Sequence, residues 1–418
     1  MPRKASFSIV SHIMAMVLAG GEGSRIQPLT KDRAKPAIPF GGRYRLIDFV
    51  LSNLVNSGII KIKVLTQFKS DSLIQHITRG WTLAPQLGQY VDIVPAQMRM
   101  GPRWYTGSAD AVLQSLSLTA NERTKYMCIL GADHVYRMDI SQMLEFHVQK
   151  SADVTMAAIP QPRSESSAFG VVDADDKKNV VKFLEKPKRP PPMHGNEDCS
   201  LASMGIYIFN FRTLKRLIEE DSMNKESTHD FGRDIIPLAL KNKYKVCMYD
   251  FSTNRIPGTT EAEIGYWRDI GSIDAYYKSS MDLVQVNPMF NLYNYEWPIF
   301  SHYQPHPPAK FVFDDDNRRG CAIDSIVSGG VIISGSTVRR SILSPHARIH
   351  SYCDIEDSII FNDVSIGRHS RIRRAIIDKE VAIPPDTQIG HDPKADKKRF
   401  KVSPDGIVVV PRNYRFES

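Results

Sequence analysis

The residues from 18 to 36 combine three closely spaced glycines with basic residues, among them Arg25 and Lys35. The apolar run before them, residues 14–18, predicts a buried strand that leads into this segment. The glycines let the backbone turn sharply and approach a ligand, and consecutive free backbone N–H groups form a concave anion site. A purely structural strand-to-helix turn is the alternative for a glycine cluster without these charges. The residues that we expect to bind a triphosphate here are Gly20, Gly21, Gly23, Arg25 and Lys35.

Two familiar phosphate-binding patterns do not fit this loop. The dinucleotide fingerprint G-x-G-x-x-G requires a third glycine at the position of Ile26. The P-loop pattern G-x-x-x-x-G-K-[ST] occurs nowhere in the chain. The loop therefore indicates a different way of binding a nucleotide.

Two aspartates offer oxygen ligands for a hard metal ion. Asp133 follows the apolar run 126–130, which predicts a strand with this carboxylate at its carboxyl end. Asp269, in the segment W-R-D-I-G, can supply a second carboxylate. Mg²⁺ usually takes one or two carboxylates together with substrate phosphates, so the pair predicts a magnesium site. A helix cap or a turn is the alternative role for each aspartate, and we expect the adjacent His134 to be structural.

Short apolar runs alternate with amphipathic stretches from residue 13 to about residue 286. Strands separated by helices predict an α/β domain whose largely parallel sheet is covered on both faces. Ligands of such sheets bind beyond the carboxyl ends of the strands, where the glycine-rich loop lies. The predicted strands are 13–19, 60–66, 126–130, 154–159, 204–210 and 245–250, and the predicted helices include 47–57 and 138–150.

The segment after residue 318 carries an apolar residue at every fifth or sixth position. The steps of 6, 6 and 5 repeat, so equivalent positions recur every 17 residues. This period fits neither a helix nor a single strand, and it predicts a parallel β-helix whose three short faces each point one aliphatic side chain inward. Stacked coils bury such a core, and their flat faces invite oligomer contacts. The predicted inward positions are Ile326, Ile332, Val338, Leu343, Ile349, Ile355, Ile360, Ile366, Ile372, Ile377, Ile383 and Ile389.

Length, charge and cysteine content bound the class of protein. The 418 residues suggest two or three domains, and a net charge of +8 with a pI near 9.1 favours anionic partners. A nucleic-acid binder would show a basic stripe with stacking aromatic residues, and none occurs, so phosphorylated metabolites are the favoured partners. Five widely spaced cysteines without zinc-ligand spacing fit a reducing cytoplasm. No signal peptide or membrane span is expected, because the apolar runs are too short.

Longer motifs carry a family resemblance over nearly the whole chain. The segments L-A-G-G-E-G-S-R-I-Q-P-L-T (18–30) and R-A-K-P-A (33–37) resemble the signature of sugar-1-phosphate nucleotidyltransferases. Within that group, five further motifs resemble the bacterial glucose-1-phosphate adenylyltransferases. They are F-G-G-R-Y-R-L-I-D-F-V-L-S-N (40–53), W-Y-T-G-S-A-D-A (104–111), G-A-D-H-V-Y (131–136), S-M-G-I-Y-I-F (203–209) and W-R-D-I-G (267–271).

The resemblance implies a Rossmann-like nucleotidyltransferase domain over residues 1–286, with a mostly parallel mixed sheet. A linker over 287–318 and a C-terminal left-handed parallel β-helix over 319–418 follow. The implied reaction is an in-line attack by the phosphate oxygen of α-D-glucose 1-phosphate on the α-phosphorus of ATP. The products are pyrophosphate and ADP-glucose, the glucosyl donor for glycogen synthesis. Positioning and charge neutralisation do most of the work in such transfers.

Site residues follow from the same resemblance. The implied catalytic residues are Arg25, Lys35, Asp133 and Asp269, with Mg²⁺ on the two aspartates. The implied contacts to glucose 1-phosphate are Tyr105, Gly170, Glu185, Lys186 and Ser203. The implied contacts to ATP are Gly20, Gly21, Gly23, Gln67 and Gln97. From the residues alone, Tyr105 and Ser203 are ordinary core or turn residues, and a surface role suits both glutamines.

Two further alternatives stay open at this point. A noncatalytic regulatory subunit of the same fold is one, and the retention of the implied catalytic residues argues against it. A transferase for UTP, dTTP or another sugar phosphate is the other. The motifs at 40–53 and 104–111 oppose it, although the choice of nucleotide rests on resemblance alone.

Members of this family are commonly allosteric homotetramers that bind anionic metabolites between their two domains. The basic residues Arg33, Arg43 and Arg45 are the implied effector contacts. A second basic cluster lies at residues 368–374, and solvated surface is the alternative for both clusters. Relatives that respond to fructose 1,6-bisphosphate typically carry lysine where this chain has Asp32. We therefore expect fructose 6-phosphate or pyruvate as the activator.

Overall fold

A computed structural model describes residues 9–97, 104–119 and 123–416. The N-terminal part is built on a nine-stranded mixed sheet of strand order β10-β9-β11-β6-β1-β4-β5, in which β8 joins β11 to β12. Strands β4, β1 and β6 run parallel, whereas β11 runs antiparallel to β6 and β8. The strands are β1 (Ile13–Ala19), β4 (Lys61–Thr66), β5 (Tyr90–Pro95), β6 (Tyr126–Gly131), β8 (Val154–Pro162), β9 (Gly170–Ala174), β10 (Val180–Glu185), β11 (Cys199–Asn210) and β12 (Val246–Asp250).

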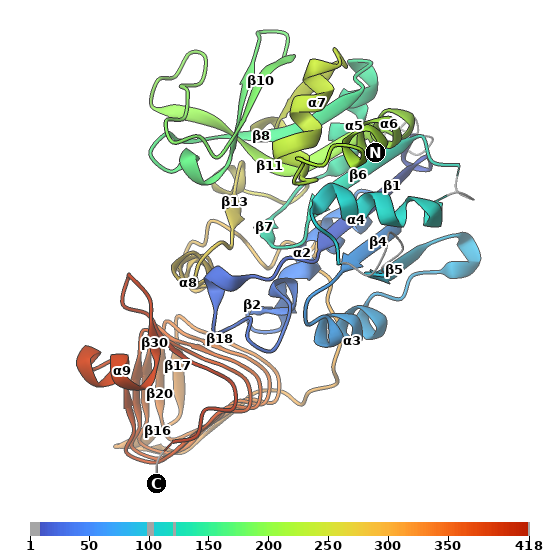
Figure 1. The fold of residues 1–418 in the computed structure, drawn as a ribbon. Coiled ribbons are helices and arrows are strands. Elements are labelled where there is room, and N and C mark those ends of the chain that lie inside the picture. Colours follow the sequence, from blue (N-terminus) through green and yellow to red (C-terminus); the bar gives the residue numbers. More distant parts are fainter. Residues whose placement is uncertain (1–8, 98–103, 120–122, 417–418) are drawn as a thin grey trace.

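Both faces of this sheet are covered, as the sequence predicts (Figure 1). Along β1, Ala15 and Val17 pack with helices α2 and α5, while Met14 and Met16 pack with α4 and α6. This alternation buries the central strand on both sides. The helices are α2 (Leu46–Asn56), α3 (Asp71–Gly80), α4 (Ser108–Ser115), α5 (Ile140–Gln149), α6 (Phe211–Ser222), α7 (Ile236–Lys241), α8 (Ile273–Asp282) and α9 (Pro393–Arg399).

Two short antiparallel pairs lie outside the large sheet. Strand β7 (His134–Tyr136) pairs with β13 (Trp267–Asp269), and β2 (Pro39–Phe40) pairs with β3 (Tyr44–Arg45). The first pair brings residues more than a hundred positions apart in the chain into one register. It therefore decides how Asp269 lies relative to Asp133.

The C-terminal part is a parallel β-helix, as the repeat predicts. Three sheets form its sides, and the stacked coils give it a triangular outline (Figure 1). One sheet contains β14 (Lys310–Val312), β19 (Ile332–Ser334), β22 (Arg348–Ile349), β25 (Ser365–Ile366) and β28 (Ala382–Ile383). The second contains β17 (Cys321–Ile323), β20 (Thr337–Arg339), β23 (Asp354–Glu356), β26 (Arg371–Arg373) and β29 (Gln388–Ile389). The third contains β18 (Ile326–Val327), β21 (Ile342–Leu343), β24 (Ile359–Ile360), β27 (Ala375–Ile377), β31 (Val408–Val410) and β30 (Lys401–Val402). A small hairpin, β15 (Asp314–Asp315) with β16 (Arg318–Arg319), lies beside the first coil.

Ten of the twelve predicted inward positions lie in the buried core of the β-helix, and two are wrong by one residue. In the first coil, Val327 and Ile333 pack with this core, in place of the predicted Ile326 and Ile332. The first repeat is one residue shorter than 17, since Ile333 is in register with Ile349. The sequence pattern does not reveal this one-residue shift, because aliphatic residues stand side by side at 326–327 and at 332–333.

The two parts share a hydrophobic interface. Ile342, Ile359 and Ile376 point away from the β-helix core and pack with Tyr276 and Phe290 of the N-terminal part. The first strand of the β-helix, β14, precedes residue 319, and the domain boundaries expected from the sequence stay predictions. No helix in the described residues is long and apolar enough to cross a membrane.

Candidate active site

The glycine-rich loop leaves the carboxyl end of β1 and turns into a short 3₁₀ helix, Ser24–Ile26. Gly23 has a φ of 65°, and a Cβ there would lie 3.0 Å from the Thr30 side chain, so the turn requires glycine. The loop lines a cavity of about 280 Å³ that also contains three predicted catalytic residues. The predicted residues in this lining are Gly21, Gly23, Arg25, Lys35 and Asp133.

The structure brings the two predicted metal carboxylates together. Asp269 is in register with His134 in the β7–β13 pair, and Asp133 immediately precedes β7. The Lys35 ammonium lies between the two carboxylates, with Nζ 2.6 Å from Asp133 Oδ2 and 3.7 Å from Asp269 Oδ1. The Arg25 guanidinium and the Asp269 carboxylate both border Gly271. Three distant segments of the chain thus bring Arg25, Lys35, Asp133 and Asp269 close together.

Charge, more than burial, decides the state of Asp133. Burial by itself raises the pKa of the Asp133 carboxyl, but the charge and hydrogen bond of Lys35, with the neighbouring His134 ring and a backbone hydrogen bond, outweigh burial and lower the pKa to about 2. Asp133 is therefore a carboxylate at neutral pH. Lys35 is only 8% exposed, and its nearby carboxylates compensate for its burial.

His134 lies beside the two aspartates, and the structural role that we expected for it stays a prediction. Its Nε2 atom lies 3.6 Å from Asp133 Oδ1 and 3.8 Å from Asp269 Oδ1. The three side chains offer ligand atoms within 4.8 Å of one another, close enough to hold one metal ion together. The ring packs edge-on against Trp267, which fixes its orientation.

A second cavity of about 270 Å³ adjoins the first, and the two share Leu18, Arg25 and Asp133. Its lining includes four of the five predicted contacts to glucose 1-phosphate, namely Gly170, Glu185, Lys186 and Ser203. A Cβ on Gly170 would lie 3.0 Å from Glu185 Oε2 and 2.4 Å from the Phe183 ring, so a side chain at this position would displace the Phe183 ring. Lys186 has a φ of 48°, and its half-exposed side chain lies near Glu185.

Tyr105 and the two glutamines lie outside these linings. The Tyr105 backbone N–H donates to Gln67 Oε1 at 2.9 Å, and Gln67 lies beside Gly20 of the loop. Gln97 donates to the Pro95 carbonyl at the end of β5. The three residues therefore lie on the β4 and β5 side of the loop, and their substrate contacts stay predictions.

Sequence reasoning missed part of the second cavity. Ser108, Asp230 and Gly232 also line it. Asp230 caps the π-helical turn Phe231–Ile235 by accepting from the Gly232 N–H and receives a hydrogen bond from Ser108 Oγ at 2.9 Å. A Cβ on Gly232 would lie 2.6 Å from Glu185 Oε2. The segment D-F-G at 230–232 is the signal that could have revealed this wall.

The predicted effector residues separate into two environments. Arg43 and Arg45 line a cleft of about 550 Å³ between the two parts of the chain. Arg33 is not in this lining; it is buried and forms a bidentate ion pair with Asp378 of the β-helix, at 2.8 and 3.1 Å. Lys379 lines the cleft instead. Burial, followed by the charges of Arg45 and Arg33, lowers the pKa of the Lys379 ammonium to about 7.

Comparison with known proteins agrees with this geometry. Residues 14–286 match the family described as "Nucleotidyl transferase", and residues 307–410 match the one described as "GlmU-like, C-terminal hexapeptide". By its larger domain the chain is therefore a nucleotidyltransferase.

Its full-length relatives narrow the class. A glucose-1-phosphate adenylyltransferase of Anaeromyxobacter sp. (strain Fw109-5) is 53% identical, covering 98% of this chain and 100% of the relative. Those of Deinococcus deserti and Methylococcus capsulatus are 48% and 51% identical, covering 97% and 95% of this chain and 99% and 92% of the relatives. The chain belongs to the glucose-1-phosphate adenylyltransferase family.

Proposed function

We propose that this chain transfers the adenylyl group of ATP to α-D-glucose 1-phosphate, giving pyrophosphate and ADP-glucose, a glucosyl donor for glycogen synthesis. The observation that carries the proposal is the position of Lys35, Asp133 and Asp269 at the junction of two cavities. The glycine loop lines one cavity, and Glu185 and Lys186 line the other. The names of the relatives support the same reaction.

The roles of the residues follow from their positions. The glycine loop and Arg25 bind the triphosphate, and Lys186 holds the phosphate of the sugar as a point charge. A phosphate oxygen of glucose 1-phosphate attacks the α-phosphorus, the bond to the β-phosphate oxygen breaks, and pyrophosphate leaves with the electron pair. Because the attacking oxygen is already anionic, no protein base is needed, and Lys35 neutralises charge that develops at the α-phosphate.

The carboxylates of Asp133 and Asp269 fit a bound Mg²⁺. Their oxygens are the hard ligands that this cation prefers, and they gather within 4.8 Å of one another with His134. When bound there, Mg²⁺ would neutralise and orient the phosphate oxygens of ATP. Lys35 shares the same two carboxylates, which suits a site that must balance several phosphate charges.

Allosteric control by anions is the second part of the proposal. Arg43, Arg45 and Lys379 surround the interdomain cleft with positive charge. Arg33 contributes through its ion pair with Asp378, which joins the two domains beside this cleft. Fructose 6-phosphate or pyruvate is the proposed activator, and neither carries the second phosphate of fructose 1,6-bisphosphate.

A cytoplasmic homotetramer is the proposed working form. The described cysteines are all free thiols, which suits a reducing compartment. Phe311, Phe313 and Ile323 are exposed on the first coils of the β-helix, where apolar surface favours contact with another copy. Size-exclusion chromatography with light scattering measures the assembly, and a monomer would contradict this part of the proposal.

A pyrophosphate-release assay that crosses ATP, UTP, dTTP and GTP with several sugar 1-phosphates tests the reaction. We expect turnover to be highest with ATP and glucose 1-phosphate. Preference for UTP or dTTP would reject the adenylyl assignment and keep the nucleotidyltransferase one. Addition of each metabolite to the same assay tests the effectors, and strong activation by fructose 1,6-bisphosphate alone would contradict the proposed activator.

A further inference from the structure

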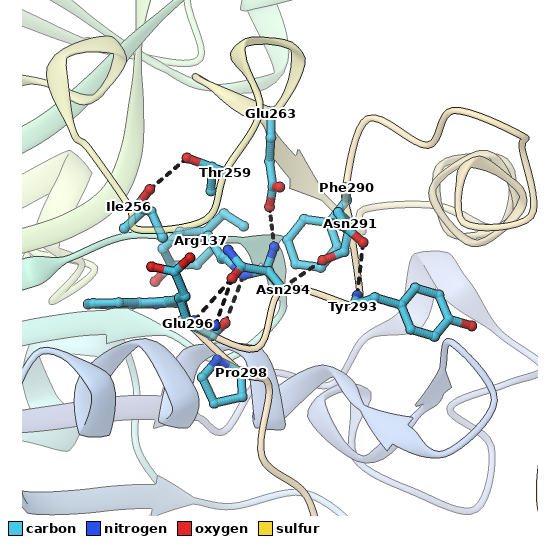
Figure 2. Close-up of polar contacts among 12 residues, drawn as sticks. Arg137, Ile256, Thr259, Glu263, Phe290, Asn291, Tyr293, Asn294, Glu296 and Pro298 are labelled. Atoms are coloured by element: carbon cyan, nitrogen blue, oxygen red, sulfur yellow. Dashed lines mark hydrogen bonds and ion pairs between the residues drawn. The ribbon is translucent and has the colours of Figure 1, made fainter.

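Arg137 is a buried arginine that joins three segments of the chain (Figure 2). It follows β7 directly and lies four residues after Asp133. Its Nη1 atom donates to Glu263 Oε1, and its Nη2 atom donates to the Asn291 carbonyl at 2.8 Å. Its Nε atom donates to the Trp297 carbonyl at 3.1 Å. One guanidinium thus holds the segment before β13 and two points of the linker.

The environment makes this contact costly to disturb. The Arg137 and Glu263 side chains are almost fully buried, so each depends on the other for charge compensation. The guanidinium also lies over the Phe290 ring, with Cζ 4.5 Å from the ring centroid. Removal of either charge leaves the other buried without its ionic partner, and the three segments lose their common anchor.

One end of this anchor leads to the metal carboxylates. Glu263 closes the 3₁₀ turn Glu261–Glu263, which precedes β13 by three residues. Strand β13 carries Asp269 and pairs with β7, and Asp133 precedes β7. The Arg137–Glu263 pair therefore clamps β7 and β13 together at the end opposite the carboxylates.

The other end leads to the interdomain cleft. The linker residues between its two contacts with Arg137 include Leu292, Tyr293 and Tyr295, and all three line the cleft with Arg43 and Arg45. Asn294 keeps this short loop compact, because its side chain accepts from the Glu296 and Trp297 N–H groups and donates to the Pro257 carbonyl (Figure 2). The cleft wall is therefore only one or two residues along the chain from the carbonyls that Arg137 binds.

We propose that Arg137 is a positioning residue that couples the interdomain cleft to the Asp133–Asp269 carboxylate pair. The inference rests on the metal and effector roles proposed above. An anion that draws in the linker moves the Asn291 and Trp297 carbonyls. Through Arg137 and Glu263, that movement shifts the position of β13 relative to β7. Metal affinity and activation by an effector then change together when Arg137 is altered.

Variants at both ends of the pair test this coupling. Arg137→Lys keeps the charge but places all its N–H donors on one nitrogen, so it preserves the ion pair but cannot reach both linker carbonyls. Glu263→Gln keeps the shape and breaks the charge pair. Asn56→Ala is the matched control, because Asn56 Nδ2 donates to the Pro298 carbonyl, the next in the same linker, from helix α2. The readouts are Mn²⁺ affinity by electron paramagnetic resonance, the activation ratio with fructose 6-phosphate and with pyruvate, and Tm.

We expect Arg137→Lys and Glu263→Gln to weaken Mn²⁺ binding by about tenfold and to bring the activation ratio toward 1. Asn56→Ala should lower Tm and leave Mn²⁺ affinity unchanged. Equal Mn²⁺ affinity in the wild type and both Arg137–Glu263 variants, or equal effects from Asn56→Ala, would overturn the coupling and leave the proposed reaction intact. A wild type that makes ADP-glucose without binding Mn²⁺ would overturn the metal assignment and this inference with it.

Discussion

The affinity of the interdomain cleft for an activating anion should fall as the pH rises above 7, because Lys379 loses its proton there. Lys379 is half-buried and lines the cleft beside Arg45. Burial and the charges of Arg45 and Arg33 lower the Lys379 pKa to about 7, and the Asp378 carboxylate only partly opposes them. In the free protein, about half of the Lys379 side chains are therefore protonated at neutral pH. The arginines that line the same cleft keep their charge.

A bound anion favours the charged form and so raises the Lys379 pKa. If the pKa in the complex lies well above 8, the apparent Kd scales with 1 + 10^(pH − 7), which is about 2 at pH 7 and about 11 at pH 8. The Kd should therefore rise about fivefold between these values and change little below pH 6.5. Burial lowers the pKa of His302 and His306 in the same cleft, so both titrate at lower pH than Lys379.

Calorimetric titration with fructose 6-phosphate and with pyruvate, from pH 6.5 to 8, measures this slope. Lys379→Arg keeps a charge that does not titrate in this range, so its affinity should stay flat and exceed that of the wild type at pH 8. Lys379→Gln should bind weakly at every pH. A flat profile in the wild type, or the same slope in Lys379→Arg, would refute the assignment of Lys379 as the titrating anion contact.

Three other substitutions probe the remaining roles, and a fourth, Glu380→Gln, serves as a control. Asp133→Asn should lower kcat by at least about a hundredfold while circular dichroism shows a native fold, and near-normal turnover would reject its metal role. Lys186→Ala should raise the KM for glucose 1-phosphate by about ten- to a hundredfold, since a charged hydrogen bond to phosphate is lost; an effect on ATP alone would contradict this. Asp378→Asn leaves the Arg33 charge buried and should destabilise the protein by about 3–5 kcal/mol in thermal unfolding. Glu380→Gln removes the more exposed partner of the Arg412 ion pair and should destabilise the protein by less than about 1 kcal/mol. Equal destabilisation by Asp378→Asn and Glu380→Gln would refute the distinction between a buried and an exposed ion pair.

Strand periodicity predicted most of the large sheet, because its central strands are buried on both faces and stand out as apolar runs. The predicted strands 13–19 and 60–66 match β1 and β4 to within one residue. β7 and β13 were not predicted as strands, because three residues have no measurable period and their pairing depends on tertiary structure. The β-helix was predicted from its repeat, and only the first coil slipped in register.

The residues of the candidate site were predictable where the residue type by itself indicates which ligand it binds. Glycines, Arg25, Lys35 and the two aspartates suggest phosphate and metal binding by themselves, and the fold brings them together. The roles of His134 and Lys379 depend on neighbours that no local pattern reveals. For Arg33 the local pattern favours an anion contact, because the residue lies in a basic cluster. The fold pairs Arg33 instead with Asp378, which lies 345 positions away in the chain.

Strand β7 explains why chemistry and domain packing cannot be independent in this chain. Successive residues of a strand face opposite sides. His134 lies in the second cavity, and Tyr136 packs in the core under the sheet. Val135 faces the other way, into the hydrophobic cluster that extends to Ile342 and Ile359 of the β-helix. A rotation of the β-helix that repacks this cluster therefore acts on the backbone that also carries His134. A packed cluster resists small continuous adjustment, so β7 is linked to the β-helix through the side chains of this cluster.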